Sequence, residues 1–191
     1  KITVKHAQDY YYYSKGEPPE KDLNILYLDI ETYSTTKEFP NVIDAEHPVC
    51  LITYCYHGKY KTYVVDNKAL LKNKELPDIR EDESIVIFKN EKSMLSTFIQ
   101  DLRKIDPDII TGWNVVGFDL YYLHNRFKKL GIKQSSMSKF NEVSFVVDEQ
   151  RNYCDIAGFT VLDMLKLYRS FTFTQRENYR LGTIGKVELD E

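Results

Sequence analysis

The segment from Asp108 to Asp119 reads Asp-Ile-Ile-Thr-Gly-Trp-Asn-Val-Val-Gly-Phe-Asp, and it decides the fold predicted for this chain. Its first half is a short apolar run that suits a buried strand. Its second half leads into a helix whose apolar face carries Leu120, Leu123 and Phe127. A strand that passes directly into a helix indicates an α/β fold. Asp119 then lies in the first turn of the helix, where the helix dipole alone favours a carboxylate.

A second acidic stretch, Tyr27-Leu28-Asp29-Ile30-Glu31-Thr32, lies ninety positions earlier at the end of an apolar strand. Residues two apart in a strand point to the same face, so Asp29 and Glu31 project together from a face that is otherwise apolar. Burying two like charges is costly unless cations compensate them, and carboxylate oxygens are the ligands that Mg²⁺ or Mn²⁺ prefer. Together with Asp119, the two carboxylates of this strand predict a site for two divalent metal ions, of the kind that hydrolyses phosphodiesters.

Two other acidic positions receive a different interpretation. The pattern Asp-x-Glu recurs as Asp44-Ala45-Glu46, between two prolines, and we interpret that copy as a solvated loop. Asp163 lies within an apolar run. It is either a capped or paired structural carboxylate or a distant residue of the site.

The rest of the chain fits the same architecture. Strands are expected over about residues 23–33, 49–56, 60–65, 84–88 and 108–113, with 84–88 buried on both faces. Helices are expected from the N-cap Ser93 to Asp106-Pro107, over about 117–130 and 160–168, and from 179 onward. Residues 66–83 are predicted to form a loop, and 141–161 a β-hairpin with a polar tip.

Length and composition set the limits of the prediction. The 191 residues fit one large domain, 23–191, preceded by a connector from an N-terminal domain, 1–22. The formal net charge of −3 argues against a stand-alone nucleic-acid binder, whereas 15 tyrosines and 10 phenylalanines offer stacking surface for unpaired bases. Three cysteines without paired spacing indicate a reducing compartment, and no apolar run is long enough to span a membrane.

Taken together, Asp29-Ile30-Glu31 and Asn114-x-x-x-Phe118-Asp119 resemble the first two proofreading motifs of family B DNA polymerases. The flanking stretches 111–114, 125–126, 161–164 and 178–181 are similar to that family too, so the resemblance covers about residues 23–187. The stretch Phe171-Thr172-Phe173-Thr174 leans toward phage polymerases related to that of T4. It suggests a viral source and hence the host cell cytoplasm.

The resemblance implies a ribonuclease H-like mixed sheet flanked by helices, with an inserted β-hairpin, of the exonuclease type that uses four carboxylates and one tyrosine. It implies a DNA-directed DNA polymerase whose 3′→5′ exonuclease domain is this chain. Asp29, Glu31 and Asp119 match three metal-binding catalytic carboxylates, with Mg²⁺ or Mn²⁺ as cofactor. Asn114 and Phe118 would position the 3′ end of single-stranded DNA.

The family's third motif, Tyr-x-x-x-Asp, does not occur in this sequence. We therefore expect a fragment that ends before that motif and is nearly inactive by itself. The implied partners are the primer 3′ end, the remaining polymerase domains and a sliding clamp, with no membrane. The alternatives are an exonuclease-like scaffold that binds primer DNA and supports the polymerase, and a free-standing nuclease of the same superfamily.

Overall fold

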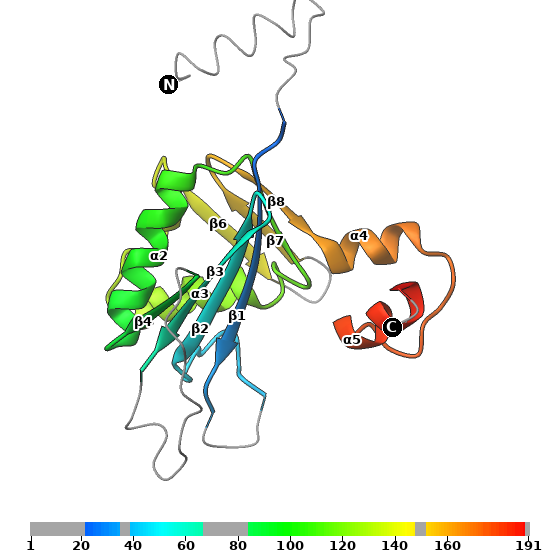
Figure 1. Cartoon of the computed structure of the whole chain (residues 1–191), viewed down its shortest axis with the longest axis horizontal. Coiled ribbons are helices and arrows are strands. Elements are labelled where there is room, and N and C mark those ends of the chain that lie inside the picture. The colour runs from blue at the N-terminus through cyan, green and yellow to red at the C-terminus, as the bar shows by residue number, and fades with distance from the viewer. Residues whose placement is uncertain (1–21, 35–38, 67–83, 148–151, 190–191) are drawn as a thin grey trace, which may run out of the picture.

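The computed structural model describes residues 22–34, 39–66, 84–147 and 152–189. A six-stranded mixed sheet in the order β4-β3-β2-β1-β5-β8 forms the centre of the molecule (Figure 1). Strand β1, Ile25–Thr32, lies inside the sheet and pairs antiparallel with β2, Val49–Tyr56, and parallel with β5, Ile109–Gly112. Strand β8, Thr160–Asp163, continues the parallel half. The carboxyl ends of β1, β5 and β8 therefore lie at the same end of the sheet, where β1 carries Asp29 and Glu31 and β8 carries Asp163.

The other half of the sheet begins as a hairpin. Strand β3, Lys59–Val65, pairs antiparallel with β2, and the turn between them places His57 and Gly58 at positive φ. Strand β4, Ile85–Phe88, pairs parallel with β3 alone. It is thus an edge strand, and all four of its residues are only half-buried. The prediction of a strand buried on both faces is wrong, because an apolar run does not tell which neighbours the sheet will provide.

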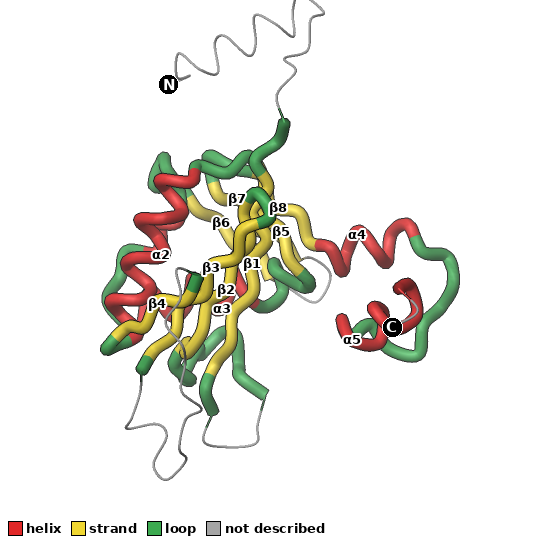
Figure 2. Tube along the Cα trace, in the orientation of Figure 1, coloured by secondary structure: helices red, strands yellow, loops and turns green. Residues whose placement is uncertain are grey.

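Two helices, α2 (Glu91–Ile105) and α3 (Asp119–Lys129), bring their apolar faces to the core (Figure 2). The predicted stripe of α2 is buried at Leu95, Phe98, Ile99 and Leu102, and that of α3 at Leu120, Leu123 and Phe127. The core also takes in the inward-facing side chains of β1 and β2, Leu26, Leu28, Ile30, Ile52 and Tyr54.

The helix boundaries correct two predictions. The N-cap of α2 is Asn90, whose Oδ1 accepts the Ser93 N–H at 2.9 Å, so Ser93 is already inside the helix. Asparagine is as good a cap as serine, and the sequence offered both within four residues. Helix α3 begins at Asp119 and not near Gly117, because residues 113–118 form turns.

The C-terminal part was only partly predicted. The helix expected over 160–168 is strand β8 followed by α4, Met164–Phe171, and the apolar run from Thr160 adds to the sheet because β5 has a free edge there. Helix α5, Leu181–Leu189, follows, and both helices extend to one side of the body (Figure 1). The short helix η1, Gln134–Met137, and the antiparallel pair β6, Val143–Val147, and β7, Asn152–Ile156, precede β8.

Several predictions fall on residues outside the described ranges. They concern the connector up to residue 21, most of the loop at 66–83 and the tip of the predicted hairpin at 148–151. Among the helices of the described ranges, none has the length and apolar character that crossing a membrane requires.

Candidate active site

The candidate site forms where the pairing between β1 and β5 stops. The two strands pair at Ile25–Tyr27, and β5 ends at Gly112. Beyond that point β1 loses its parallel partner, and its backbone donors need another acceptor. The Ile30 N–H donates to Oδ1 of Asp119 at 3.0 Å. Asp119 thus replaces the missing strand and attaches the start of α3 to the residue between Asp29 and Glu31.

Gly112 makes this close approach possible. A Cβ atom at position 112 would lie 2.4 Å from the Leu28 carbonyl oxygen, closer than real Cβ contacts come. Any larger residue would force β1 and β5 apart one position before Asp29. The glycine therefore determines how closely the strand that carries two of the predicted ligands approaches the strand that leads to the third.

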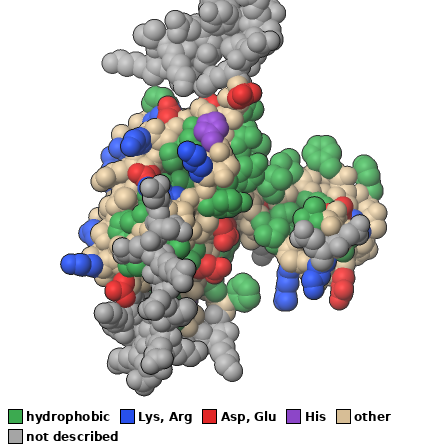
Figure 3. Space-filling model, viewed as in Figure 1, with side chains coloured by type: hydrophobic (Ala, Val, Ile, Leu, Met, Phe, Trp, Pro, Cys, Tyr) green, Lys and Arg blue, Asp and Glu red, His purple; other side chains and the backbone are tan. Residues whose placement is uncertain are grey.

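Asp29 and Glu31 point to the other face of β1, and both are exposed. Tyr27 on the same face is 51% exposed. The expectation that two carboxylates are buried together is wrong for this pair, since α2 and α3 cover the opposite face. Figure 3 shows acidic and hydrophobic side chains next to each other on the visible face of the body.

A β-bulge lies at the same place. Glu31 pairs with Leu51 and Thr32 with Val49, so Cys50 is an extra residue on β2, and its Sγ donates to the Glu31 carbonyl at 3.4 Å. Bulges bend a strand and redirect its side chains, and they are common beside functional sites. Here the extra residue of β2 lies directly opposite the end of β1 that carries Glu31.

The buried carboxylate of the site is Asp119, which is 3% exposed. Burial raises its pKa to about 8, the Ile30 N–H opposes that rise, and the negative charges of Asp29 and Asp163 add to it. Partial burial also raises the pKa of Asp29. An acidic side chain with such a pKa, next to a second carboxylate, is typical of functional sites and of places that take up a cation.

The turn between β5 and α3 carries the two predicted substrate-binding residues. Asn114 is exposed and has φ of +60°, a conformation that asparagine tolerates better than most residues. Its carbonyl accepts the Phe118 N–H at 2.9 Å, which closes the turn. Phe118 is half-buried, and its ring lies 5.5 Å from that of Tyr122. Both residues are therefore held at the entrance to α3, beside Asp119.

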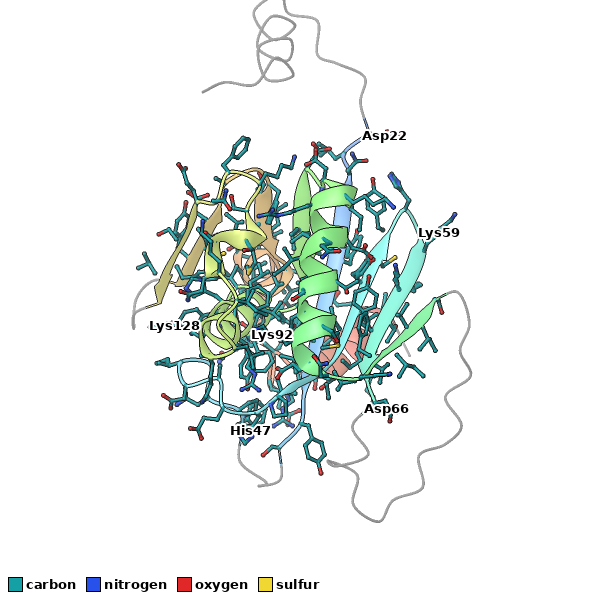
Figure 4. All side chains as sticks on the ribbon, turned by 90° about the vertical axis from the view of Figure 1, so that its left-hand side faces the viewer. Asp22, His47, Lys59, Asp66, Lys92 and Lys128 are labelled. Carbon is teal, nitrogen blue, oxygen red and sulfur yellow. The ribbon has the colours of Figure 1, made fainter. Side chains whose placement is uncertain are left out.

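Helix α3 also holds the segment 45–47, which leads into β2. The Arg126 guanidinium forms two 2.7 Å hydrogen bonds with Glu91 and donates to the Ala45 and Glu46 carbonyls. The Tyr122 hydroxyl donates to the His47 carbonyl at 2.6 Å. Figure 4 shows His47 and Lys128 on the same part of the molecule as α3, with α2 in front of the sheet. These contacts fix residues 45–47, directly before β2.

In the part of the chain that the structure describes, no three His, Cys, Asp or Glu side chains gather into a metal-binding group. Asp119 is brought to β1, and Asp29 is close enough to influence its pKa. Asp163 caps α4, which agrees with the structural role that the sequence offered for it. Sequence reasoning missed the close approach at Gly112 and the second contact of Asp163, with the Val116 N–H, because both depend on partners distant in the chain.

The fold and its acidic strand ends define an α/β domain with a candidate site at the carboxyl ends of parallel strands. Residues 1–184 match the family described as DNA polymerase family B, exonuclease domain, and the chain belongs to that family. The DNA-directed DNA polymerases of Escherichia phage RB69 and Enterobacteria phage T4 are 28% and 29% identical to it over 88% of the chain. The DNA polymerase delta catalytic subunit of Caenorhabditis elegans is 43% identical over 56% of the chain and 11% of its own length. The chain spans about a fifth (21%) of the length of either phage polymerase.

Proposed function

We propose that this chain belongs to the 3′→5′ proofreading exonuclease domain of a DNA-directed DNA polymerase, and that this domain, within the polymerase, hydrolyses the 3′-terminal phosphodiester of single-stranded DNA. One observation carries the proposal. The Asp119 carboxylate is attached to the backbone of β1 at Ile30, between Asp29 and Glu31. This contact holds the acidic residue of the second motif next to the strand segment that carries the two acidic residues of the first.

The donor set suits hard divalent cations, Mg²⁺ or Mn²⁺. A buried Asp119 with a pKa of about 8 beside the charge of Asp29 is a costly arrangement that a cation would relieve. Asp29, Glu31 and Asp119 would hold the ions. When bound, such ions activate water for attack and neutralise charge on the scissile phosphate. Two of the carboxylates are exposed and can exchange water for substrate, whereas Asp119 provides a fixed point in the core.

Asn114 and Phe118 would position the terminal nucleotide. Asn114 presents an exposed amide from a turn with a defined backbone conformation, which suits hydrogen bonding to a sugar or base. Phe118 offers part of its ring at the start of α3, which suits packing against an unstacked base. A frayed single strand can enter such a site, whereas a paired terminus would first have to be separated.

The sheet order supports a ribonuclease H-like fold for this domain, since three antiparallel strands, β1 to β3, continue through β1 into the parallel strands β5 and β8. The pair β6–β7 would be an insertion into that fold. The remaining polymerase domains and a sliding clamp are the proposed protein partners. If the source is viral, the protein would act in the host cell cytoplasm.

The test uses a polymerase-length protein that carries this chain, with 5′-labelled single-stranded DNA and Mg²⁺ or Mn²⁺. We expect shortening from the 3′ end, and loss of at least about a hundredfold in rate for Asp29→Ala. Asp44→Ala is the matched control, because it removes a carboxylate from the other Asp-x-Glu copy, in an exposed loop. Equal rates for wild type and Asp29→Ala would reject the assignment. Primer binding without hydrolysis in the wild type would favour the scaffold alternative.

A further inference from the structure

Asp163 makes hydrogen bonds to two different parts of the chain. Its Oδ1 accepts the Leu165 N–H at 3.0 Å and the Lys166 N–H at 3.3 Å, which caps α4. Its Oδ2 accepts the Val116 N–H at 3.0 Å. The side chain is 5% exposed. One buried carboxylate therefore joins the end of β8, the start of α4 and the turn between β5 and α3.

Val116 lies in the middle of the turn that carries Asn114 and Phe118 and leads into Asp119. The turn has no strand partner, and its regular contacts are local: the Phe118 and Leu120 N–H groups donate to the Asn114 and Val115 carbonyls. The Val116 N–H is buried, so without Asp163 it would need another acceptor. The Oδ2 atom of Asp163 is the long-range contact that fixes the middle of the turn.

The end of β8 that carries Asp163 is itself well fixed. Gly112 and Asp163 are paired residues of β5 and β8, and the Thr111 hydroxyl donates to the Leu162 carbonyl at 2.7 Å. Trp113, the first residue of the turn, is also held, because its indole N–H donates to the Tyr179 carbonyl at 3.0 Å. A small displacement of Asp163 would thus pass directly to the turn.

We propose that Asp163 is a positioning residue of the exonuclease site, an inference that rests on the proposed function. It touches neither the substrate nor the proposed metal ligands. It holds the turn at Val116, the turn determines where Asp119 enters α3, and Asp119 is attached to β1 at Ile30. The placement of Asn114 and of the Asp119 carboxylate depends on this chain of contacts.

The residue type supports this role. A helix N-cap needs one acceptor oxygen, and serine, threonine or asparagine would provide it for α4. Only a carboxylate offers two acceptor oxygens on a planar group, so that one can cap the helix while the other accepts from Val116. Asp163 uses both.

This requirement also gives the test. Asp163→Asn keeps the volume and one oxygen for the cap, but its amide group then faces the Val116 N–H. Asp163→Ser keeps a good cap in a smaller side chain, which cannot reach Val116. Asn90→Ala is the matched control, because it removes the N-cap of α2, away from the turn. It measures what the loss of a helix cap does by itself.

Two measurements decide the question. In the 191-residue chain, amide hydrogen exchange at Val116 and Ile30 should become about tenfold faster in both Asp163 variants and remain unchanged in Asn90→Ala. In the polymerase-length protein, the Mn²⁺ concentration for half-maximal exonuclease activity should rise about tenfold in the Asp163 variants, and stay within twofold of wild type in the control.

Unchanged exchange at Ile30, or a Mn²⁺ requirement equal to that of Asn90→Ala, would overturn the positioning role. If the polymerase-length protein has no exonuclease activity that depends on Asp29, the proposed function fails. The exchange rates at Val116 and Ile30 then still decide whether Asp163 holds the turn against β1.

Discussion

Replacing Asp119 with asparagine should change how the stability of the chain depends on pH. In the folded chain without metal, burial raises the pKa of Asp119 to about 8, from an ordinary value of 3.8. The folded state therefore binds the proton more tightly than the unfolded state. Between about pH 4 and pH 8 the folded chain keeps a proton that the unfolded chain has lost.

The direction of the effect follows from this difference. The stability that protonated Asp119 contributes is complete below about pH 4 and decreases as the pH rises, until it is lost near pH 8. A shift from 3.8 to about 8 corresponds to a ceiling of about 6 kcal/mol. Local relaxation and water entry reduce such values, so we expect a loss of about 2–4 kcal/mol in the free energy of unfolding.

Asparagine at position 119 does not titrate, and its side-chain oxygen can still accept the Ile30 N–H. The variant should therefore lack most of the decrease in stability between pH 5 and pH 8.5. At pH 8.5 it should be the more stable protein by about 2–4 kcal/mol. Urea unfolding at several pH values, with a chelator present, measures both curves. Asp44→Asn, in an exposed loop, is the control and should follow the wild type.

Adding Mn²⁺ at pH 8 provides the second half of this experiment. An ion held by ionised Asp119 stabilises the folded state by mass action, so the wild type should recover stability and Asp119→Asn should recover less. Parallel pH curves for the wild type and Asp119→Asn would refute the claim that Asp119 is a buried acid with a raised pKa. Equal gains from Mn²⁺ would refute its role as a ligand.

Three further substitutions test the surroundings of the site. Gly112→Ala should lower the free energy of unfolding by about 1–3 kcal/mol, measured by urea unfolding, because its Cβ would collide with the Leu28 carbonyl. Glu91→Gln should lower it by about 3–5 kcal/mol in the same assay, since it leaves the buried Arg126 guanidinium without its charged partner. Asp101→Ala removes the shared acceptor of two tyrosine hydroxyls and a lysine, and thermal unfolding should show a loss of about 1–3 kcal/mol. The pKa of Asp101 is lowered by these donors, so its contribution is present above pH 4 and should disappear as the pH falls below that value.

Several elements of the fold could be predicted because their signals are local. The apolar stripes of α2 and α3, the turn at His57 and Gly58, and the end of α2 at Asp106 depend on nearby residues. The errors arose where the answer depends on a distant partner. Ile85–Phe88 has the composition of a central strand but lies at an edge. The run from Thr160 has the spacing of a helix start, yet it pairs with β5, fifty residues earlier in the chain.

The candidate site shows the same division between features with local sequence signals and features that depend on distant partners. Sequence patterns could select Asp29, Glu31 and Asp119, because strand periodicity and motif spacing are readable in one dimension. They could not tell which of these carboxylates is buried, and the expectation placed the burial on the wrong pair. Burial depends on which face the helices cover, and α2 and α3 cover the face opposite to Asp29 and Glu31.

The two buried carboxylates of this region, Asp119 and Asp163, both accept hydrogen bonds from backbone N–H groups. Where β5 stops, Asp119 accepts the N–H of Ile30, and where the turn leaves the sheet, Asp163 accepts the N–H of Val116. Among the described residues, neither group forms an ion pair with a cationic side chain, so backbone donors must offset their burial. Asp163 accepts three backbone N–H groups. Asp119 has less support and a pKa of about 8. This difference explains why the residue that supports the turn can remain a fixed part of the fold, whereas Asp119 is left with an unmet electrostatic requirement that a divalent ion would satisfy.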